Sequence, residues 1–266
     1  MLLTRQNDPD QASAFIVGRT EQWIPGSLDN HRHIKHQLIY ATRGVVHIST
    51  ARKAWILPPT RALWITAGTE HSLKVKKTAE AKVLYIDNAV PTIQNCQDCI
   101  VVNVSPLVRE LILNCAALPW NYCNDSANGR LSQVLIDQLQ TLNDTPVYLP
   151  IPADSRAVQL VNILHNDPSN RESLISLAQR VGASARTIER IFMFETHMTF
   201  STWRYRQRLI TALELLAYGE SITNVAFAIG YESASSFVAS FKKYFGTTPY
   251  RYFKINRVDI IDNKNI

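Results

Sequence analysis

The first third of the chain is patterned in short apolar segments. Between about residues 15 and 87, runs rich in β-branched and aromatic side chains recur every 8–12 residues or so, separated by Gly, Pro, Asn and Thr. The clearest runs are QLIYAT, VVHIST, KAWIL, ALWIT and KVLYID. Strands at this spacing predict a small all-β barrel or sandwich.

After Asp87 the apolar positions follow helical periodicity. Two amphipathic segments, residues 104–118 and 130–142, predict helices, and Ser105 followed by Pro106 is a helix-start signal. Either a homodimer interface or the chain's own β domain could cover the apolar faces of these helices. The faces consist of Leu107, Leu111, Ile112 and Cys115 in the first segment, and Leu131, Val134, Leu135 and Leu139 in the second.

The sequence LPIPADS (149–155) predicts a linker, and the pattern beyond it is helical almost to the end. Helices are expected over 155–165, 173–181, 184–195, 199–217, 221–229 and 233–245. The expected organisation is therefore multidomain, with both α and β parts. It comprises a β domain over 1–90, a helical linker or dimerisation segment over 91–150, an all-α domain over 151–255 and a tail over 256–266.

The helical domain contains an internal repeat. Each copy has a short amphipathic helix, a turn that begins at Gly, a Ser N-cap and a second helix with two apolar anchors four residues apart. This arrangement predicts two helix-turn-helix units, because Gly permits the turn and a small residue lets the helices cross closely. The aligned positions are Leu177, Ala178, Val181, Gly182, Ser184, Ile188 and Phe192 with Val225, Ala226, Ile229, Gly230, Ser233, Phe237 and Phe241.

The exposed face of each second helix is then free to enter a major groove of DNA with its N-terminal residues leading. Glu189 lies on the first of these faces, where pairing with an arginine and accepting a hydrogen bond from cytosine are both open. The expected DNA-binding residues are Ser184, Ala185, Arg186, Thr187 and Arg190 in the first copy, and Ser233, Ser235, Ser236, Ala239 and Lys242 in the second.

A long helix is expected between the two copies, and Gly219 would terminate it. Eighteen helical residues span about 27 Å, which could set the two recognition helices near one DNA turn apart, about 34 Å. Arg204 and Arg208 share a face of this helix and are expected either to contact phosphates or to solvate the surface.

Composition and charge fit this organisation. The chain is 46% hydrophobic and 19% charged, so it can form two cores, and its net charge of +6 is compatible with a polyanionic partner. No run approaches the roughly 18 apolar residues of a membrane helix, and the start lacks a signal core, so a cytoplasmic protein is expected. The basic excess is concentrated in residues 171–208.

Residues 155–253 resemble the DNA-binding domain of the AraC/XylS family of bacterial transcription regulators. The resemblance is carried by SLAQRVGASARTIERIF, by the segment from TFSTWRYRQRL to ASFKKYFGTTPYRY, and by Gly246 and Pro249. It implies two helix-turn-helix units on one DNA face and control of a promoter, most often by activation. Family members usually carry more charge in the second recognition helix, so the first copy is expected to dominate specificity.

The β domain contains a histidine cluster that resembles cupin motifs and implies a cupin-like sensor. Alternation would put His31 and His33 on one strand face, and the barrel could bring His71 beside them. Gln37 stands where a metallocupin has a carboxylate, which weakens affinity for a divalent cation. Three interpretations stay open: a site for Zn, Ni, Fe or Cu, a metal-free pocket for a small effector, and a structural role. The motifs are Gly26–x4–His31–x–His33–x3–Gln37–x6–Gly44 and Thr66–x–Gly68–x2–His71.

The predicted function is sequence-specific DNA binding by an effector-responsive regulator, not an enzyme. Its expected partners are double-stranded DNA, a small-molecule effector, a second copy of the chain and, for an activator, RNA polymerase. The rival hypotheses are a metal-dependent cupin enzyme with an accessory DNA-binding domain and an architectural DNA binder. Cofactors are undetermined apart from the possible divalent metal. The pair Cys96 and Cys99 lacks the second pair that a zinc ribbon needs.

Overall fold

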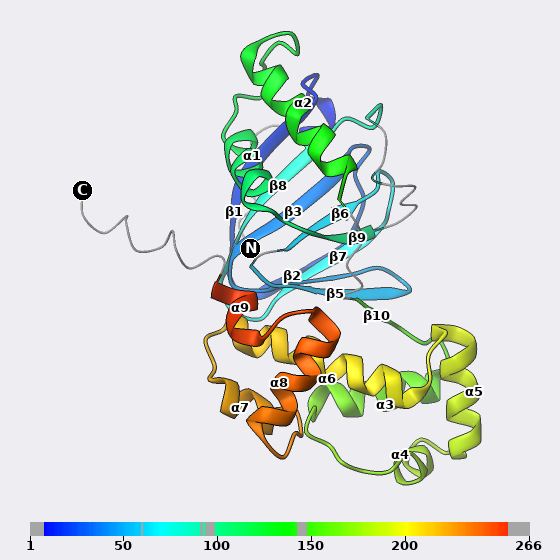
Figure 1. The fold of residues 1–266 in the computed structure, drawn as a ribbon. Coiled ribbons are helices and arrows are strands. Elements are labelled where there is room, and N and C mark those ends of the chain that lie inside the picture. The colour runs from blue at the N-terminus through cyan, green and yellow to red at the C-terminus, as the bar shows by residue number, and fades with distance from the viewer. Residues whose placement is uncertain (1–7, 60, 91–92, 94–98, 143–147, 255–266) are drawn as a thin grey trace. The chain divides into compact units, whose positions relative to one another are not determined.

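The computed structural model describes residues 8–59, 61–90, 93, 99–142 and 148–254 (Figure 1). The chain forms two compact units. Unit 1 comprises residues 1–50 and 57–147, and unit 2 comprises residues 51–56 and 148–266. The predicted β N-terminal part and helical C-terminal part are confirmed. Cys96, of the pair Cys96 and Cys99, and the predicted tail, 256–266, lie outside the described residues.

Unit 1 is built on antiparallel strands. One sheet runs in the order β1 (Ile16–Trp23), β8 (Ala79–Ile86), β3 (His36–Arg43), β6 (Arg61–Ile65), β9 (Cys99–Asn103). Of the second sheet, β4 (Val46–Ser49), β7 (His71–Val75) and β2 (Gly26–His31) lie in unit 1 in that order. A short 3-10 helix, η1 (Pro9–Gln11), precedes β1. The register pairs Gln37 of β3 with Tyr85 of β8 and His31 of β2 with His71 of β7.

Two helices, α1 (Pro106–Ala116) and α2 (Ala127–Gln140), complete the core of unit 1. The helix α1 packs against β1, β8 and α2, and its buried residues join one apolar cluster with the first sheet. The approach is close, because a Cβ on Gly18 would lie 2.8 Å from the Cα of Ala116. Most of the apolar face of both helices is therefore covered within unit 1. Leu107 and Val134 remain 55% and 45% exposed.

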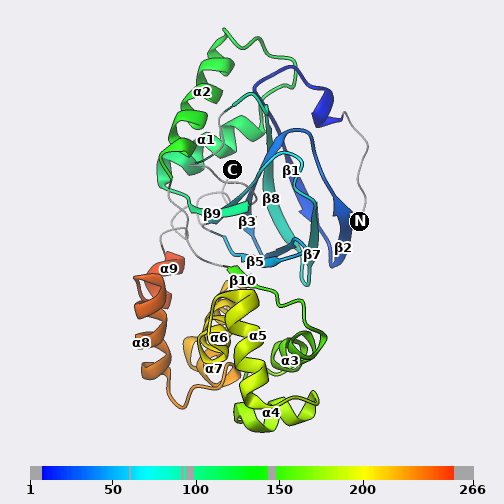
Figure 2. The same cartoon turned by 90° about the vertical axis from the view of Figure 1, so that its right-hand side faces the viewer.

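Unit 2 contains seven helices among its described residues (Figures 1 and 2). Six of them agree with the expected ranges to within one or two residues. Each of the six begins at a Ser, Thr or Asp whose side chain accepts a backbone N–H, a contribution of about 0.5–2 kcal/mol per cap. They are α3 (Ser155–Asn166), α4 (Leu174–Arg180), α5 (Ala185–Thr196), α6 (Phe200–Ala217), α7 (Ile222–Ala228) and α8 (Ala234–Phe245), and the seventh is α9 (Pro249–Lys254).

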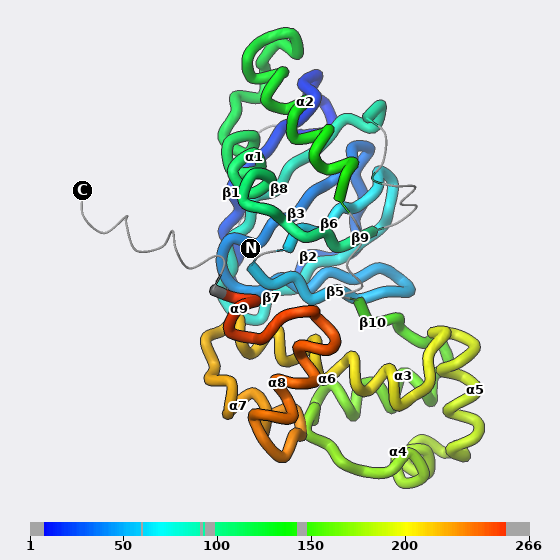
Figure 3. The backbone as a smooth tube through the Cα atoms, in the orientation of Figure 1, coloured from blue at the N-terminus to red at the C-terminus, as the bar shows by residue number. Residues whose placement is uncertain are grey.

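Two local expectations were wrong. The predicted linker begins inside β10 (Tyr148–Pro150), which pairs with β5 (Lys53–Leu57), so only residues 151–154 connect β10 to α3 (Figure 3). The strand β2 ends at His31, so His33 lies in the connection to β3 and does not share a strand face with His31. Backbone pairing with a distant partner decides both boundaries, and local patterning does not report it.

Candidate DNA interface and sensor site

The internal repeat folds as two helix-turn-helix motifs, α4–α5 and α7–α8. Both turns begin at a glycine in the left-handed region, with φ of 68° at Gly182 and 83° at Gly230. The small residues expected in the first helices, Ala178 and Ala226, are fully buried, as close helix crossing requires. Figures 1 and 2 show α6 between the two motifs.

The second helix of each motif is held by two anchors. Ile188 and Phe192 of α5 and Phe237 and Phe241 of α8 each have 0% exposure. Because the anchors are four residues apart, they occupy one helical face and leave the opposite face to solvent.

The solvent-facing positions of α5 and α8 also correspond along the repeat. The guanidinium groups of Arg186 and Arg190 have no ion-pair partner among the described residues, so they are available to a ligand. The equivalent face of α8 has one cationic side chain, and its other two side chains are small and uncharged. Met193, which the sequence analysis did not list, also lies on the α5 face, three residues beyond Arg190, and is 49% exposed. The exposed equivalents are Arg186, Arg190 and Met193 with Ser235, Ala239 and Lys242.

The hydroxyl groups at the start of both helices serve as caps. The Oγ of Ser184 accepts a hydrogen bond from the backbone N–H of Thr187 at 3.1 Å, and the Oγ of Ser233 accepts one from Ser236 at 3.2 Å. The hydroxyls of each Ser–Thr or Ser–Ser pair also contact each other. Ala185 is half-buried. These predicted DNA-binding residues therefore form the helix starts, with part of their hydrogen-bonding capacity already used.

Glu189 has an intramolecular role. Its Oε2 accepts the backbone N–H of Phe200, the first residue of α6, at 3.2 Å. A carboxylate at this position satisfies an orphan helix donor and faces the positive end of the helix dipole. Pairing with an arginine and accepting from cytosine were the two roles left open for Glu189. The contact with Phe200 is a third role, which the local sequence pattern does not indicate.

Arg204 and Arg208 hold the loop between α3 and α4. Arg204 donates from Nη1 to the carbonyl of Glu172 at 2.7 Å and from Nη2 to the carbonyl of Asn170. Arg208 donates from Nε to the carbonyl of Pro168 at 3.2 Å and from Nη2 to that of Asn170 at 2.5 Å. Burial lowers the pKa of both guanidiniums. Both were expected at phosphates or in solvent, but they are largely committed to the protein's own backbone.

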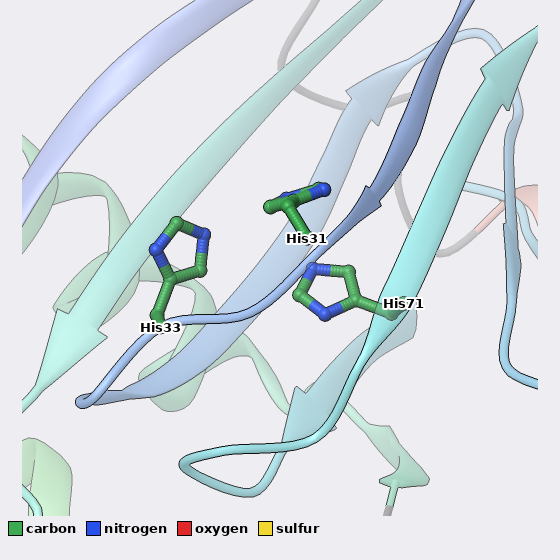
Figure 4. Close-up of side chains that lie close together, drawn as sticks. All are labelled: His31, His33 and His71. Carbon is green, nitrogen blue, oxygen red and sulfur yellow. The ribbon is translucent and has the colours of Figure 1, made fainter.

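Three histidines converge in unit 1. His31 ends β2, His33 follows in the connection, and His71 begins β7 (Figure 4). The ring centroids lie 5.2 Å apart for His31 and His33, 4.3 Å for His31 and His71, and 5.9 Å for His33 and His71. One ring nitrogen of each lies within 4.8 Å of those of the others. The expected proximity of the three side chains is therefore present.

The surroundings keep two of these rings neutral near pH 7. Burial, together with repulsion of the imidazolium by the neighbouring His31 and His33, lowers the pKa of His71 to about 4. Burial is also the main cause that lowers the pKa of His33. A neutral imidazole keeps one nitrogen lone pair free to bind a ligand.

Gln37 lies at the start of β3, fully inside unit 1. Its side chain hydrogen-bonds the hydroxyl of Tyr85. The ring of Tyr85 packs against that of His33, with the two ring centroids 5.0 Å apart. The Oε1 of Gln37 is buried without a hydrogen-bond partner among the described residues. Gln37 is thus connected to the histidines through Tyr85 and offers one free acceptor.

Comparison with known proteins gives matches over both units. Residues 25–98 match the family described as AraC-like ligand binding domain, and residues 177–255 match the family described as Helix-turn-helix domain. The HTH-type transcriptional regulator NimR of Escherichia coli (strain K12) is 34% identical over 222 residues, which cover 84% of this chain and 81% of that protein. RipA of Corynebacterium glutamicum, also an HTH-type transcriptional regulator, is 38% identical over 100 residues, 38% of this chain and 30% of RipA.

Solved structures give weaker likenesses. Wild-type ToxT from Vibrio cholerae strain SCE256, bound to an unsaturated fatty acid, aligns over 91% of this chain and 96% of its own, with 12% identity and a TM-score of 0.38. The DNA-binding domain of AdpA, in complex with a target DNA, aligns over 38% of this chain and 90% of its own, with 27% identity and a TM-score of 0.35.

None of the described helices is long and apolar enough to cross a membrane. The NimR match covers most of both proteins, and the two family matches fall on the β N-terminal part and the helical C-terminal part of the chain. The chain belongs to the AraC family of helix-turn-helix transcriptional regulators and carries an AraC-like ligand-binding domain.

Proposed function

We propose that this regulator reads DNA through α5 and α8, and that unit 1 senses a small effector and changes promoter occupancy. The correspondence of the two exposed helix faces carries the proposal. Each face stands opposite two fully buried anchors and begins at a capping serine, which is what a helix needs to present its N-terminal end to a major groove.

In this proposal α5 supplies most of the sequence discrimination. Arg186 and Arg190 are exposed and have no ion pair among the described residues. Arginine recognises guanine by bidentate hydrogen bonds to O6 and N7. Ser235 and Ala239, at the equivalent positions of α8, offer one hydroxyl and one methyl group. Lys242 of α8 is suited to a phosphate.

The proposal extends to partners and location. The protein acts on cytoplasmic double-stranded DNA as a homodimer, with Leu107 of α1 and Val134 of α2 in the contact, since both remain exposed on otherwise buried faces. Activation would add a contact with RNA polymerase. His31, His33, Gln37 and His71 would line the effector site, and no catalytic step forms part of this function.

Selection of bound fragments from bacterial genomic DNA at near-physiological salt tests the proposal. The expected result is enrichment of a few fragments that share two half-motifs. Arg186→Ala should cost about 1–3 kcal/mol at one base position and relax specificity there. Arg251→Ala, which removes another exposed cation, from α9, is the control and should leave the motif unchanged. Salt-sensitive binding without any enriched motif would contradict sequence-specific recognition.

A further inference from the structure

Two of the three histidines of unit 1, His31 and His71, share a hydrogen-bonding arrangement. The Nδ1 of His31 lies 2.9 Å from the carbonyl oxygen of Asp29, and the Nδ1 of His71 lies 3.0 Å from that of Thr69. A carbonyl oxygen can only accept, so both Nδ1 atoms carry the proton. In a neutral ring the lone pair is then on Nε2.

His33 lies near a carboxylate, beyond hydrogen-bond distance. Its Nδ1 lies 3.9 Å from Oδ2 of Asp10, and its Nε2 is buried without a hydrogen-bond partner among the described residues. Figure 4 shows the three rings close together between β2, β7 and the connection that holds His33. One ring nitrogen of each imidazole thus lies within 4.8 Å of the others, and a protein oxygen lies near the Nδ1 of each ring, at hydrogen-bond distance in His31 and His71 and at 3.9 Å in His33.

We infer that His31, His33 and His71 form a binding site for one late first-row divalent metal ion, such as Zn²⁺ or Ni²⁺, which is the effector of this regulator. Metal-bound histidines typically donate their second ring N–H to a carbonyl or carboxylate, because this fixes the tautomer and raises the basicity of the ligand nitrogen. The effector role of the metal rests on the proposed function, whereas the metal site itself does not.

The ligand set selects the class of ion. Among the described residues no carboxylate joins the cluster. Ca²⁺ and Mg²⁺ require oxygen ligands, whereas imidazole suits Zn²⁺, Ni²⁺ and Cu²⁺. Zn–N bonds of about 2.0–2.1 Å would bring the three nitrogens to about 3.4 Å from one another, so the present separations must close by at most about 1.5 Å. Three ligands leave a coordination position for water or an anion.

The site is connected to the N-terminal segment through Asp10. The carboxylate oxygens of Asp10, in η1, accept the backbone N–H groups of Ile34 and Lys35 at 3.2 and 3.3 Å. A metal ion on Nε2 of His33 makes its Nδ1–H a stronger donor and draws the Asp10 carboxylate toward it. Ion binding therefore changes how residues 8–11 are held against the connection between β2 and β3.

Titration of the chelator-stripped full chain with Zn²⁺, and with Co²⁺ as a spectroscopic probe, tests the site. The expected result is one ion per chain, with no binding of Mg²⁺. His31→Ala and His33→Ala should each weaken binding by more than about 100-fold, and both residues are only half-buried, so these variants should fold. Asp10→Asn should weaken binding by about 10–100-fold. His165→Ala, an exposed histidine of unit 2, is the matched control.

The second measurement is the affinity for a selected DNA fragment with and without Zn²⁺. A shift in the wild type that disappears in His33→Ala supports the metal as effector. Absence of stoichiometric binding, or binding by the His31→Ala and His33→Ala variants as tight as by the wild type, would overturn the site. Binding without any shift in DNA affinity would overturn the effector role. Failure to select any DNA fragment would count against the proposed DNA recognition and would leave the metal titration as an independent result.

Discussion

At the scale of single residues, the arginines of unit 2 divide into two groups by what their guanidiniums already contact. Arg208 donates to two carbonyls of the loop between α3 and α4, whereas Arg186 donates to no described group. Sequence spacing placed Arg204 and Arg208 on one helical face correctly. It could not show that backbone carbonyls of residues 168–172 lie against that face, because the loop is over thirty residues away.

This division gives opposite expectations for two alanine substitutions. Arg208→Ala should lower the free energy of unfolding by about 1–3 kcal/mol, because it removes charge-assisted hydrogen bonds and leaves the Pro168 carbonyl without its donor. Its salt dependence of DNA binding should stay near the wild-type value. Arg186→Ala should leave the stability unchanged and weaken DNA binding. Urea unfolding measures the stability of both variants, and salt titrations of DNA affinity measure the salt dependence of their binding. A reduced salt slope for Arg208→Ala would indicate that Arg208 contacts a phosphate.

At the scale of elements, the two helix-turn-helix motifs offer an internal comparison. Both turn glycines have positive φ, so an added Cβ is strained in each by about 1–2 kcal/mol. A Cβ on Gly230 would also lie 2.8 Å from the carbonyl oxygen of Ser169 and 3.0 Å from Nη2 of Arg208. A Cβ on Gly182 would meet nothing within 4 Å. The second turn is therefore packed against the loop that Arg208 holds, and the first is open.

Gly230→Ala should consequently destabilise the protein by about 1–2 kcal/mol more than Gly182→Ala, since it adds overlap to the strain that both share. Thermal or urea unfolding of the two variants makes the comparison with equal chemistry at equivalent positions. Equal losses of stability would mean that the loop moves away from the second turn at no cost, which the contacts of Arg208 argue against.

The elements also show where sequence patterning succeeds. The helices of unit 2 were predictable because their caps and apolar periodicity are local, as at Ser184 and Ser233. The strands β1, β2 and β7 did not emerge as separate runs, because pairing with distant strands stabilises them. The histidine cluster was suggested by motif resemblance. The tautomers of His31 and His71, set by the carbonyls of Asp29 and Thr69, and the position of Asp10 beside His33 required the structure.

At the scale of the whole molecule, α6 determines what DNA the two motifs of one chain can read together. It is a continuous helix of 18 residues, about 27 Å long, with contacts to both α5 and α7. Trp203, Ile210 and Leu213 of α6 are buried. A packed helix cannot stretch, so the distance between the two recognition helices is fixed by the fold and should match half-motifs about one DNA turn apart.

The spacing of half-motifs in the selected DNA is therefore expected to be rigid. Inserting 5 base pairs between the half-motifs turns one of them to the opposite face of the duplex, and affinity should fall to that of a single half-motif. Inserting 10 base pairs restores the face but adds about 34 Å, which α6 cannot span, so affinity should remain low. Fluorescence anisotropy with the three DNA spacings measures this. Recovery of affinity at 10 base pairs would show that the half-motifs are read by different protomers of a flexible dimer. In that case α6 would not set their spacing.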